Sequence, residues 1–156
     1  MTQATLMQAM KDSISNVLET MFFLMVQINN GNGTLKEWFS QGQALLGATL
    51  SFDGPVAGYF YFLIPVDMAD DITGNFLGLS PQEINEEQRK DTVKEALNMI
   101  GGGVLSLFDP KTPFKLGIPE IIAKSRIAHN KLQDLPGDFI LIETVDNRLS
   151  AGIVLN

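Results

Sequence analysis

Apolar residues recur at helical spacing near the N-terminus of the chain. From about Leu6 to Ile28 they follow a period close to 3.6 residues, which predicts a first amphipathic helix. The Asn- and Gly-rich segment 29–33 would end it, because these residues tolerate the left-handed conformation of a helix terminus. Four methionines follow the apolar stripe, and we expect them to pack in the core: Met7, Met10, Met21 and Met25.

A second long helix is predicted from about Glu86 to Phe108. Asn85 can cap its N-terminus, with Gln88 reaching back to the cap, and Asp109-Pro110 would stop it. The segments between and after the helices are typical of strands, with a short helix from Pro65 through Leu77. The predicted strands are 43–52, 56–64, 114–128, 139–145 and 149–155, with turns at 53–55 and 146–147.

The order of these elements repeats along the chain, since each half has a long helix followed by a β-hairpin. Ala57-Gly58-Tyr59-Phe60 and Ala151-Gly152-Ile153-Val154 lie at matching places in the last strands of the two hairpins. We therefore predict a single α+β domain over residues 1–156, built of duplicated helix-plus-β-hairpin halves. Its two long helices would pack on an antiparallel sheet.

Length and charge narrow the functional classes. A chain of 156 residues can bury a conventional core, and without cysteine it has neither disulfides nor thiol chemistry. The formal charge of −7, without clustered Lys and Arg, argues against nucleic-acid binding. The apolar run 21–26 is too short to span a bilayer and has no cleavage signal beside it. We expect a cytoplasmic protein that does not insert into membranes.

The second predicted helix has two contrasting faces. At 100° per residue its core stripe consists of Val93, Ala96, Leu97, Ile100, Val104 and Leu107. The opposite face carries Asp91, Glu95, Asn98 and Gly102. Any surface helix shows polar residues opposite its core, but Gly101–Gly103 each cost about 1 kcal/mol relative to alanine. Gly102 would let another surface approach, whereas Gly101 and Gly103 could serve packing against the sheet. We interpret the polar face as a docking face for a partner.

This pattern resembles the signature of the CheC/CheX/FliY family of chemotaxis phosphatases. The residues that carry it are Asp91, Glu95 and Asn98 on a helix, followed by a glycine run, with Pro119 as the proline that completes the signature. The family's duplicated fold matches the one predicted above. Closest is CheX, which has a single motif on its second long helix. The first helix has the same spacing with acid and amide exchanged, at Asp12, Asn16 and Glu19, so that copy is expected to be inactive.

The resemblance implies a phosphatase for the phospho-aspartate of a CheY-like response regulator. Asn98 would orient the attacking water, as a glutamine does in GTPases, and Glu95 would pair with the regulator's active-site lysine. Asp91 and Gly102 would contact the partner. The chain would need no cofactor of its own, because the regulator would supply the magnesium. CheX also suggests a homodimer formed through the sheet, for which the apolar strand Leu149–Leu155 is a candidate.

Two other functional classes stay open. One is a non-catalytic interaction module of the same fold, like the middle domain of flagellar switch proteins; retention of Glu95 and Asn98 favours the enzyme. The other is a small-ligand-binding domain with a pocket between helices and sheet. The remaining residues with possible chemistry are interpreted as structural: His129, Trp38, and the three acids Asp67, Asp70 and Asp71 at a helix start.

Overall fold

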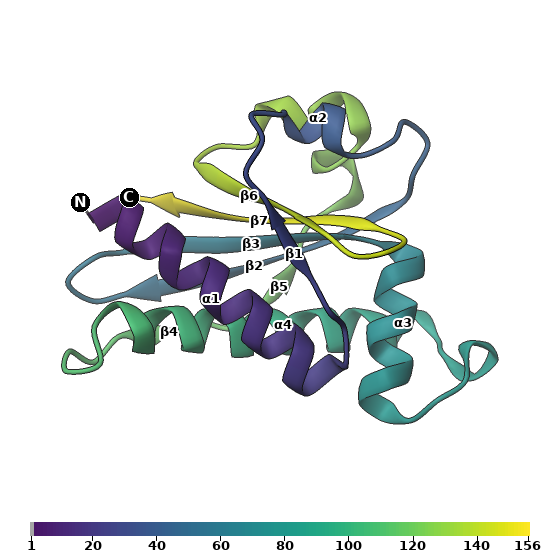
Figure 1. Cartoon of the computed structure of the whole chain (residues 1–156), viewed down its shortest axis with the longest axis horizontal. Helices are drawn as coiled ribbons and strands as arrows, with labels where there is room; N and C mark the ends of the chain where they lie inside the picture. The colour runs from purple at the N-terminus through teal and green to yellow at the C-terminus, as the bar shows by residue number, and fades with distance from the viewer. Residues whose placement is uncertain (1) are drawn as a thin grey trace.

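The structure is a computed structural model that describes residues 2–156; Met1, included in the single domain predicted over 1–156, lies outside it. Two long helices, α1 (Thr2–Phe22) and α4 (Glu86–Phe108), pack on one face of a seven-stranded antiparallel sheet (Figure 1). The strands are β1 (Gln27–Asn29), β2 (Leu45–Asp53), β3 (Gly58–Pro65), β4 (Lys115–Leu116), β5 (Glu120–Ile121), β6 (Asp138–Glu143) and β7 (Arg148–Leu155). The predicted α+β class is confirmed.

The sheet order reflects two interlocked halves. Strands run in the order β1-β6-β7-β3-β2-β4, with β5 also paired to β2. The last strands of the two hairpins, β3 and β7, pair in the centre, where Tyr61 lies opposite Gly152. The short strand after α1 pairs with the second hairpin, and the short strands after α4 pair with the first. This reciprocal exchange is the arrangement expected of a duplicated helix-plus-hairpin unit.

The main core lies between the two long helices and the sheet. Fully buried side chains from both layers meet there, including Met10, Ile14, Leu18, Phe60, Phe62, Val93, Leu97 and Ile100. Burial of each large apolar side chain contributes roughly 1.5–3 kcal/mol to the free energy of folding. The long helices therefore have fixed inner faces, and only their outer faces can serve a partner.

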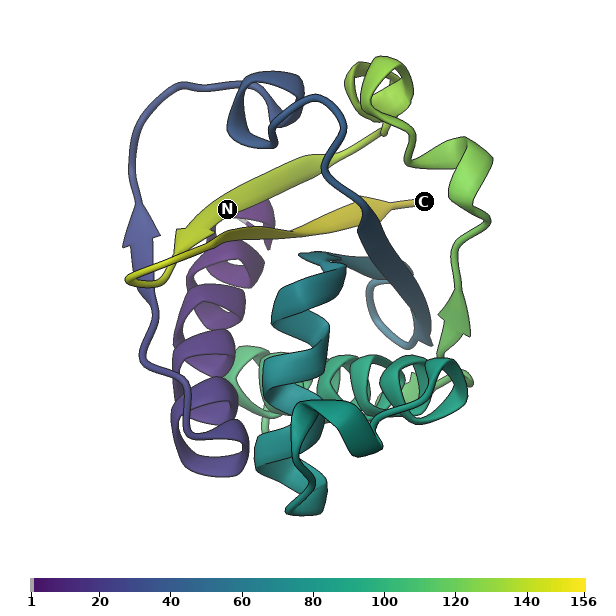
Figure 2. The ribbon, with the colours of Figure 1, turned by 90° about the vertical axis from the view of Figure 1, so that its right-hand side faces the viewer.

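The second face of the sheet is covered by α2 (Leu35–Trp38) and the short 3-10 helices η2 (Lys124–Arg126) and η3 (His129–Asp134) (Figure 2). Trp38 Nε1 donates to the Leu149 carbonyl at 2.9 Å, and His129 Nε2 lies 3.0 Å from the Phe39 carbonyl. The Trp38 side chain therefore attaches α2 to β7 of the sheet, and the His129 side chain joins η3 to α2 within the cover. The structural interpretation of Trp38 and His129 is confirmed.

The first helix ends earlier than predicted. Phe23 adopts φ 54°, and the Leu24 amide donates to the Leu18 carbonyl at 2.9 Å, which closes α1 after Phe22. The chain beyond it is extended as far as β1. Met10 is buried as expected, but the core prediction for Met21 and Met25 is wrong, because their exposed fractions are 42% and 73%.

Two strand predictions also need correction. Segment 114–128 forms only β4, β5 and a 3-10 helix, because Gly117 and Pro119 interrupt it at the edge of the sheet. Strand β7 is not an exposed edge, since it is hydrogen bonded to β3 and β6 on its two sides. Its apolar character therefore gives no reason for dimer formation. A homodimer itself stays a prediction.

Candidate functional site on helix α4

Helix α4 is a firmly anchored platform. Asn85 Oδ1 accepts a hydrogen bond from the Gln88 amide at 2.8 Å, and Gln88 Oε1 accepts one from the Asn85 amide at 3.0 Å. This is the predicted capping box. Arg89 Nε lies 2.6 Å from Asp70 Oδ1, which ties the first turn of α4 to α3 (Val66–Leu77). A helix fixed in this way holds its outer side chains with little freedom, as a docking surface requires.

The inner face of α4 agrees with the predicted core stripe except at its last turn. Val93, Ala96, Leu97, Ile100 and Val104 are all fully buried. Leu107, however, is 57% exposed, and Leu105 is buried instead. The returning segment 112–116 covers the Leu105 side of the last turn, so helical period alone gave the wrong residue there.

The outer face of α4 carries the four predicted site residues. Asp91 and Glu95 are exposed, and Asn98 and Gly102 are half-buried. Glu95 and Asn98 are three residues apart on one helix, so their side chains are neighbours. Asp91 lies 3.5 Å from Lys94 Nζ, whereas Glu95 and Asn98 form no side-chain ion pair or hydrogen bond within residues 2–156. Their carboxylate and carboxamide are therefore available to an incoming group.

The three glycines of α4 have three different surroundings. A Cβ on Gly101 would lie 2.6 Å from Leu50 Cδ2 of the sheet, as the packing interpretation expected. A Cβ on Gly103 would lie 2.3 Å from Ser13 Oγ, so this glycine admits α1 and not the sheet. Gly102 faces outward, and a Cβ there would meet only Leu116 Cδ1, at 3.9 Å. Of these three glycines, only Gly102 lacks a side chain at a position where packing inside the protein does not require its absence.

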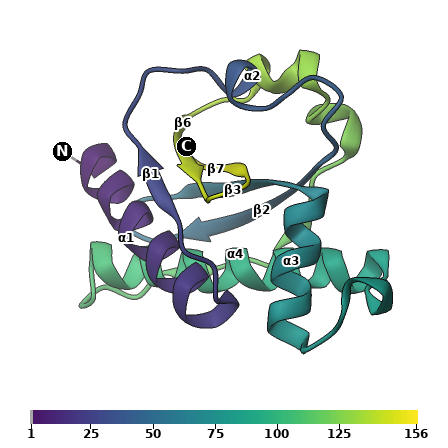
Figure 3. The same cartoon turned by 45° about the vertical axis from the view of Figure 1, so that its right-hand side comes forward.

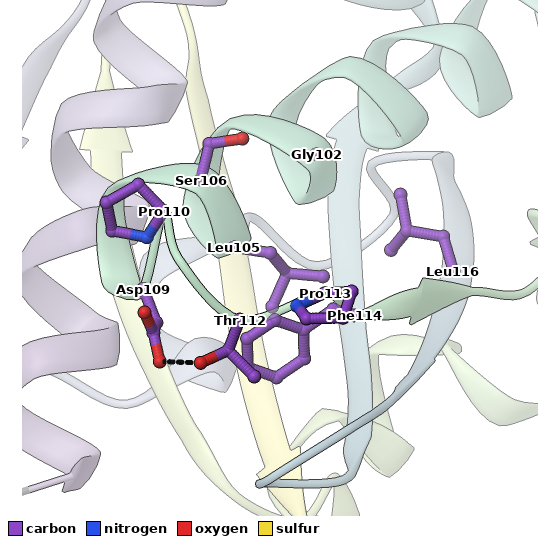
Figure 4. Close-up of a pocket in the computed structure, with 9 residues that line it drawn as sticks. All are labelled: Gly102, Leu105, Ser106, Asp109, Pro110, Thr112, Pro113, Phe114 and Leu116. Atoms are coloured by element: carbon purple, nitrogen blue, oxygen red, sulfur yellow. Dashed lines mark hydrogen bonds between the residues drawn. The ribbon is translucent and has the colours of Figure 1, made fainter.

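A hollow of about 250 Å³ lies beside Gly102, between α4 and the segment that follows it (Figure 4). Leu105, Phe114 and Leu116 form its apolar part. Asp109 holds the turn by accepting from Thr112 Oγ1 at 2.5 Å and from the Lys111 amide at 3.1 Å. The Thr112 hydroxyl, followed by that amide, lowers the pKa of the Asp109 carboxyl. The sequence did not reveal this hollow, because its walls meet only through the return of the chain.

The described residues provide no metal centre. No group of three or more His, Asp or Glu side chains that could hold a metal ion occurs in residues 2–156.

Pro119, the proline of the predicted signature, is half-buried directly before β5, and β5 contacts α4. No helix within residues 2–156 is long and apolar enough to cross a membrane. The chemistry that the face offers is one free carboxylate beside one free amide.

Comparison with known proteins agrees with this architecture. The family model "Chemotaxis phosphatase CheX" matches residues 46–142. CheX from Vibrio vulnificus superposes with a TM-score of 0.72 at 19% identity, covering 97% of this chain and 96% of that one. No curated protein matches the sequence significantly.

Two further solved structures share the fold. CheX from Borrelia burgdorferi, solved in a complex with CheY, BeF3 and Mg, has a TM-score of 0.70 at 16% identity, covering 96% of this chain and 97% of that one. The FliM middle domain from Vibrio alginolyticus has a TM-score of 0.56 at 12% identity, covering 98% and 92%. At these identities the structural matches establish the fold.

Proposed function

The chain belongs to the CheX family of chemotaxis phosphatases, and from that premise we propose that it removes the phosphoryl group from the phospho-aspartate of a CheY-like response regulator. The observation that carries the proposal is the outer face of α4. Glu95 and Asn98 are neighbours on this well-anchored helix, and their side chains form no ion pair or hydrogen bond within the described chain. Membership of the family supports the proposed substrate class, and the unpaired amide of Asn98 supports the proposed chemistry.

The reaction breaks the bond between phosphorus and the aspartate oxygen and forms one between phosphorus and a water oxygen. Inorganic phosphate and the regenerated carboxylate are the products. Such a hydrolysis needs a positioned water more than covalent chemistry from the protein. The Asn98 carboxamide can accept a hydrogen bond from the water and donate one to a phosphoryl oxygen. Asn98 is therefore the proposed catalytic residue.

Glu95 is the proposed docking residue beside it. An exposed carboxylate without an internal partner can pair with the lysine of the receiver active site, and this pair would fix the position of Asn98 over the phosphoryl group. Asp91 extends the acidic face by one turn, and the bare backbone at Gly102 lets the receiver surface come close. Magnesium would be held by the receiver's own ligands, as the contents of the Borrelia complex suggest.

The rival function is a non-catalytic interaction module, for which the likeness to the FliM middle domain is the supporting observation. The two are separated by mixing a substoichiometric amount of the chain with phosphorylated receivers and timing the loss of phosphate. A phosphatase accelerates the loss through many turnovers per molecule. Binding of a receiver without acceleration would instead establish the interaction module.

A further inference from the structure

A second hollow borders the docking face on the side of α3. Helices α3 and α4 cross, as Figure 3 shows, and this hollow lies between the end of α3 and the first half of α4. Its volume is about 330 Å³. We call it the α3–α4 notch. Its lining residues are Phe76, Leu77, Gln88, Asp91, Thr92 and Glu95. Because Asp91 and Glu95 belong to both, the notch and the docking face form one continuous surface.

The notch is preformed by contacts outside it. The ion pair between Arg89 and Asp70 joins the two helices, and the Gly78 amide ends α3 by donating to the Gly74 carbonyl at 2.9 Å. Gly78 has φ 70°, as such a helix end requires. Leu77 takes no part in these bonds, and its side chain is 45% exposed. An exposed leucine on a rigid helix end is suited to contact with a partner.

The charges around the notch indicate what it can accept. Its lining holds two carboxylates and no basic side chain among the described residues. Lys94 Nζ lies 3.5 Å from the Asp91 carboxylate, and Lys90 pairs with Glu86 on the flank of α4 away from the notch. Glu95 is therefore the lining carboxylate without an ion pair. An apolar group against Leu77 and a cation at Glu95 would be complementary to this lining. A protein surface with an apolar side chain next to a lysine offers both groups.

We propose that the α3–α4 notch receives an apolar side chain of the phosphorylated receiver, adjacent to the lysine that pairs with Glu95. This inference rests on the proposed function and adds a specificity determinant to it. A receiver that pairs with Glu95 brings its surface to the edge of the notch, since Glu95 forms part of the notch wall. Leu77 would then help to select among receivers, without touching the reacting atoms.

The test compares Leu77→Ala with Leu107→Ala, a matched control on α4 that is equally apolar, 57% exposed and outside the notch. Phosphate release is measured against concentration of a phosphorylated receiver, and binding is measured with the same receiver loaded with beryllofluoride. We expect Leu77→Ala to raise KM and Kd about five- to tenfold with kcat within about twofold. Leu77→Ile keeps an apolar side chain, so it should retain most of the wild-type affinity for the receiver. Leu107→Ala should behave like wild type.

Each outcome decides between alternatives. If the wild-type chain turns over the receiver but Leu77→Ala leaves KM and Kd unchanged, the notch inference is overturned and the proposed phosphatase stands. If the wild-type chain neither binds nor dephosphorylates any receiver, both are overturned. A change in oligomeric state on Leu77→Ala, seen by analytical ultracentrifugation, would assign the notch to a second copy of the chain and would also overturn the inference.

Discussion

Replacement of Gly102 by alanine should stabilise the protein and impair it at the same time. The new Cβ meets only Leu116 Cδ1, at 3.9 Å, so nothing inside the chain opposes it. Alanine in a helix interior is better than glycine by about 1 kcal/mol. For a chain of 156 residues that gain corresponds to a rise in Tm of about 2–4 °C. Helix stability has therefore been lost at this position without any benefit to internal packing.

We expect that the missing side chain at Gly102 instead allows the receiver to come into close contact with α4. A methyl group inserted into a close protein contact costs about 1–3 kcal/mol. Gly102→Ala should accordingly lower kcat/KM for the phosphorylated receiver by about 5- to 150-fold while Tm rises. The assay pairs a thermal melt with phosphate release at several receiver concentrations. A variant that is more stable and fully active would refute the role given to this glycine.

Gly103→Ala is the matched comparison within the same helix. Its Cβ would lie 2.3 Å from Ser13 Oγ, and that hydroxyl donates to the Ile100 carbonyl at 2.7 Å. Displacing Ser13 forfeits this buried hydrogen bond and crowds the contact between α1 and α4, so the free energy of unfolding should fall by about 1–2 kcal/mol. A rise in the free energy of unfolding for Gly102→Ala and a fall for Gly103→Ala would be hard to explain by helix propensity alone.

Two further predictions concern single side chains. Glu95→Ala should weaken binding of a beryllofluoride-loaded receiver, and Glu95→Lys should weaken it further through like-charge repulsion; equal affinity of all three proteins in a titration would rule out the proposed pairing. Tyr61 has a buried hydroxyl without a hydrogen-bond partner in the described chain, so Tyr61→Phe should raise the free energy of unfolding by about 1 kcal/mol in urea melts. Burial, followed by the charges of Tyr59 and Asp138, raises the pKa of Tyr61 above its ordinary value of 10.0. The unfolded chain then ionises first, so stability that is present below about pH 10 falls above it, and this fall should be shallower in Tyr61→Phe.

Local signals explain which parts of the fold could be predicted from the sequence. Helix α4 was predicted with its observed bounds, because Asn85, Gln88 and Asp109-Pro110 act within one turn of its ends. The end of α1 was missed because a phenylalanine at φ 54° is rare and the apolar period continues beyond it. Segment 114–128 has strand-like composition, but its pairing depends on β2, which is distant in the sequence.

The candidate site, too, could be predicted from the sequence only in part. The outer face of α4 could be predicted, since residues that share a helix face are fixed by the helical period. Its surroundings could not, because the hollow at Gly102 and the α3–α4 notch combine α4 with side chains such as Phe114 and Leu77. No spacing rule relates these residues to Glu95 and Asn98. They meet only when the chain is folded.

The most direct test of the account is the maximal dephosphorylation rate of Asn98→Ala at saturating receiver. Asn98 is half-buried on a well-anchored helix, so the substitution should leave the fold and receiver binding nearly intact. Loss of one positioned hydrogen-bonding group at a transition state costs on the order of 10²-fold or more. We therefore predict that kcat falls by that factor while Kd for the beryllofluoride-loaded receiver changes little. Full turnover by Asn98→Ala would contradict the mechanism, even if the wild-type chain proved to be a phosphatase.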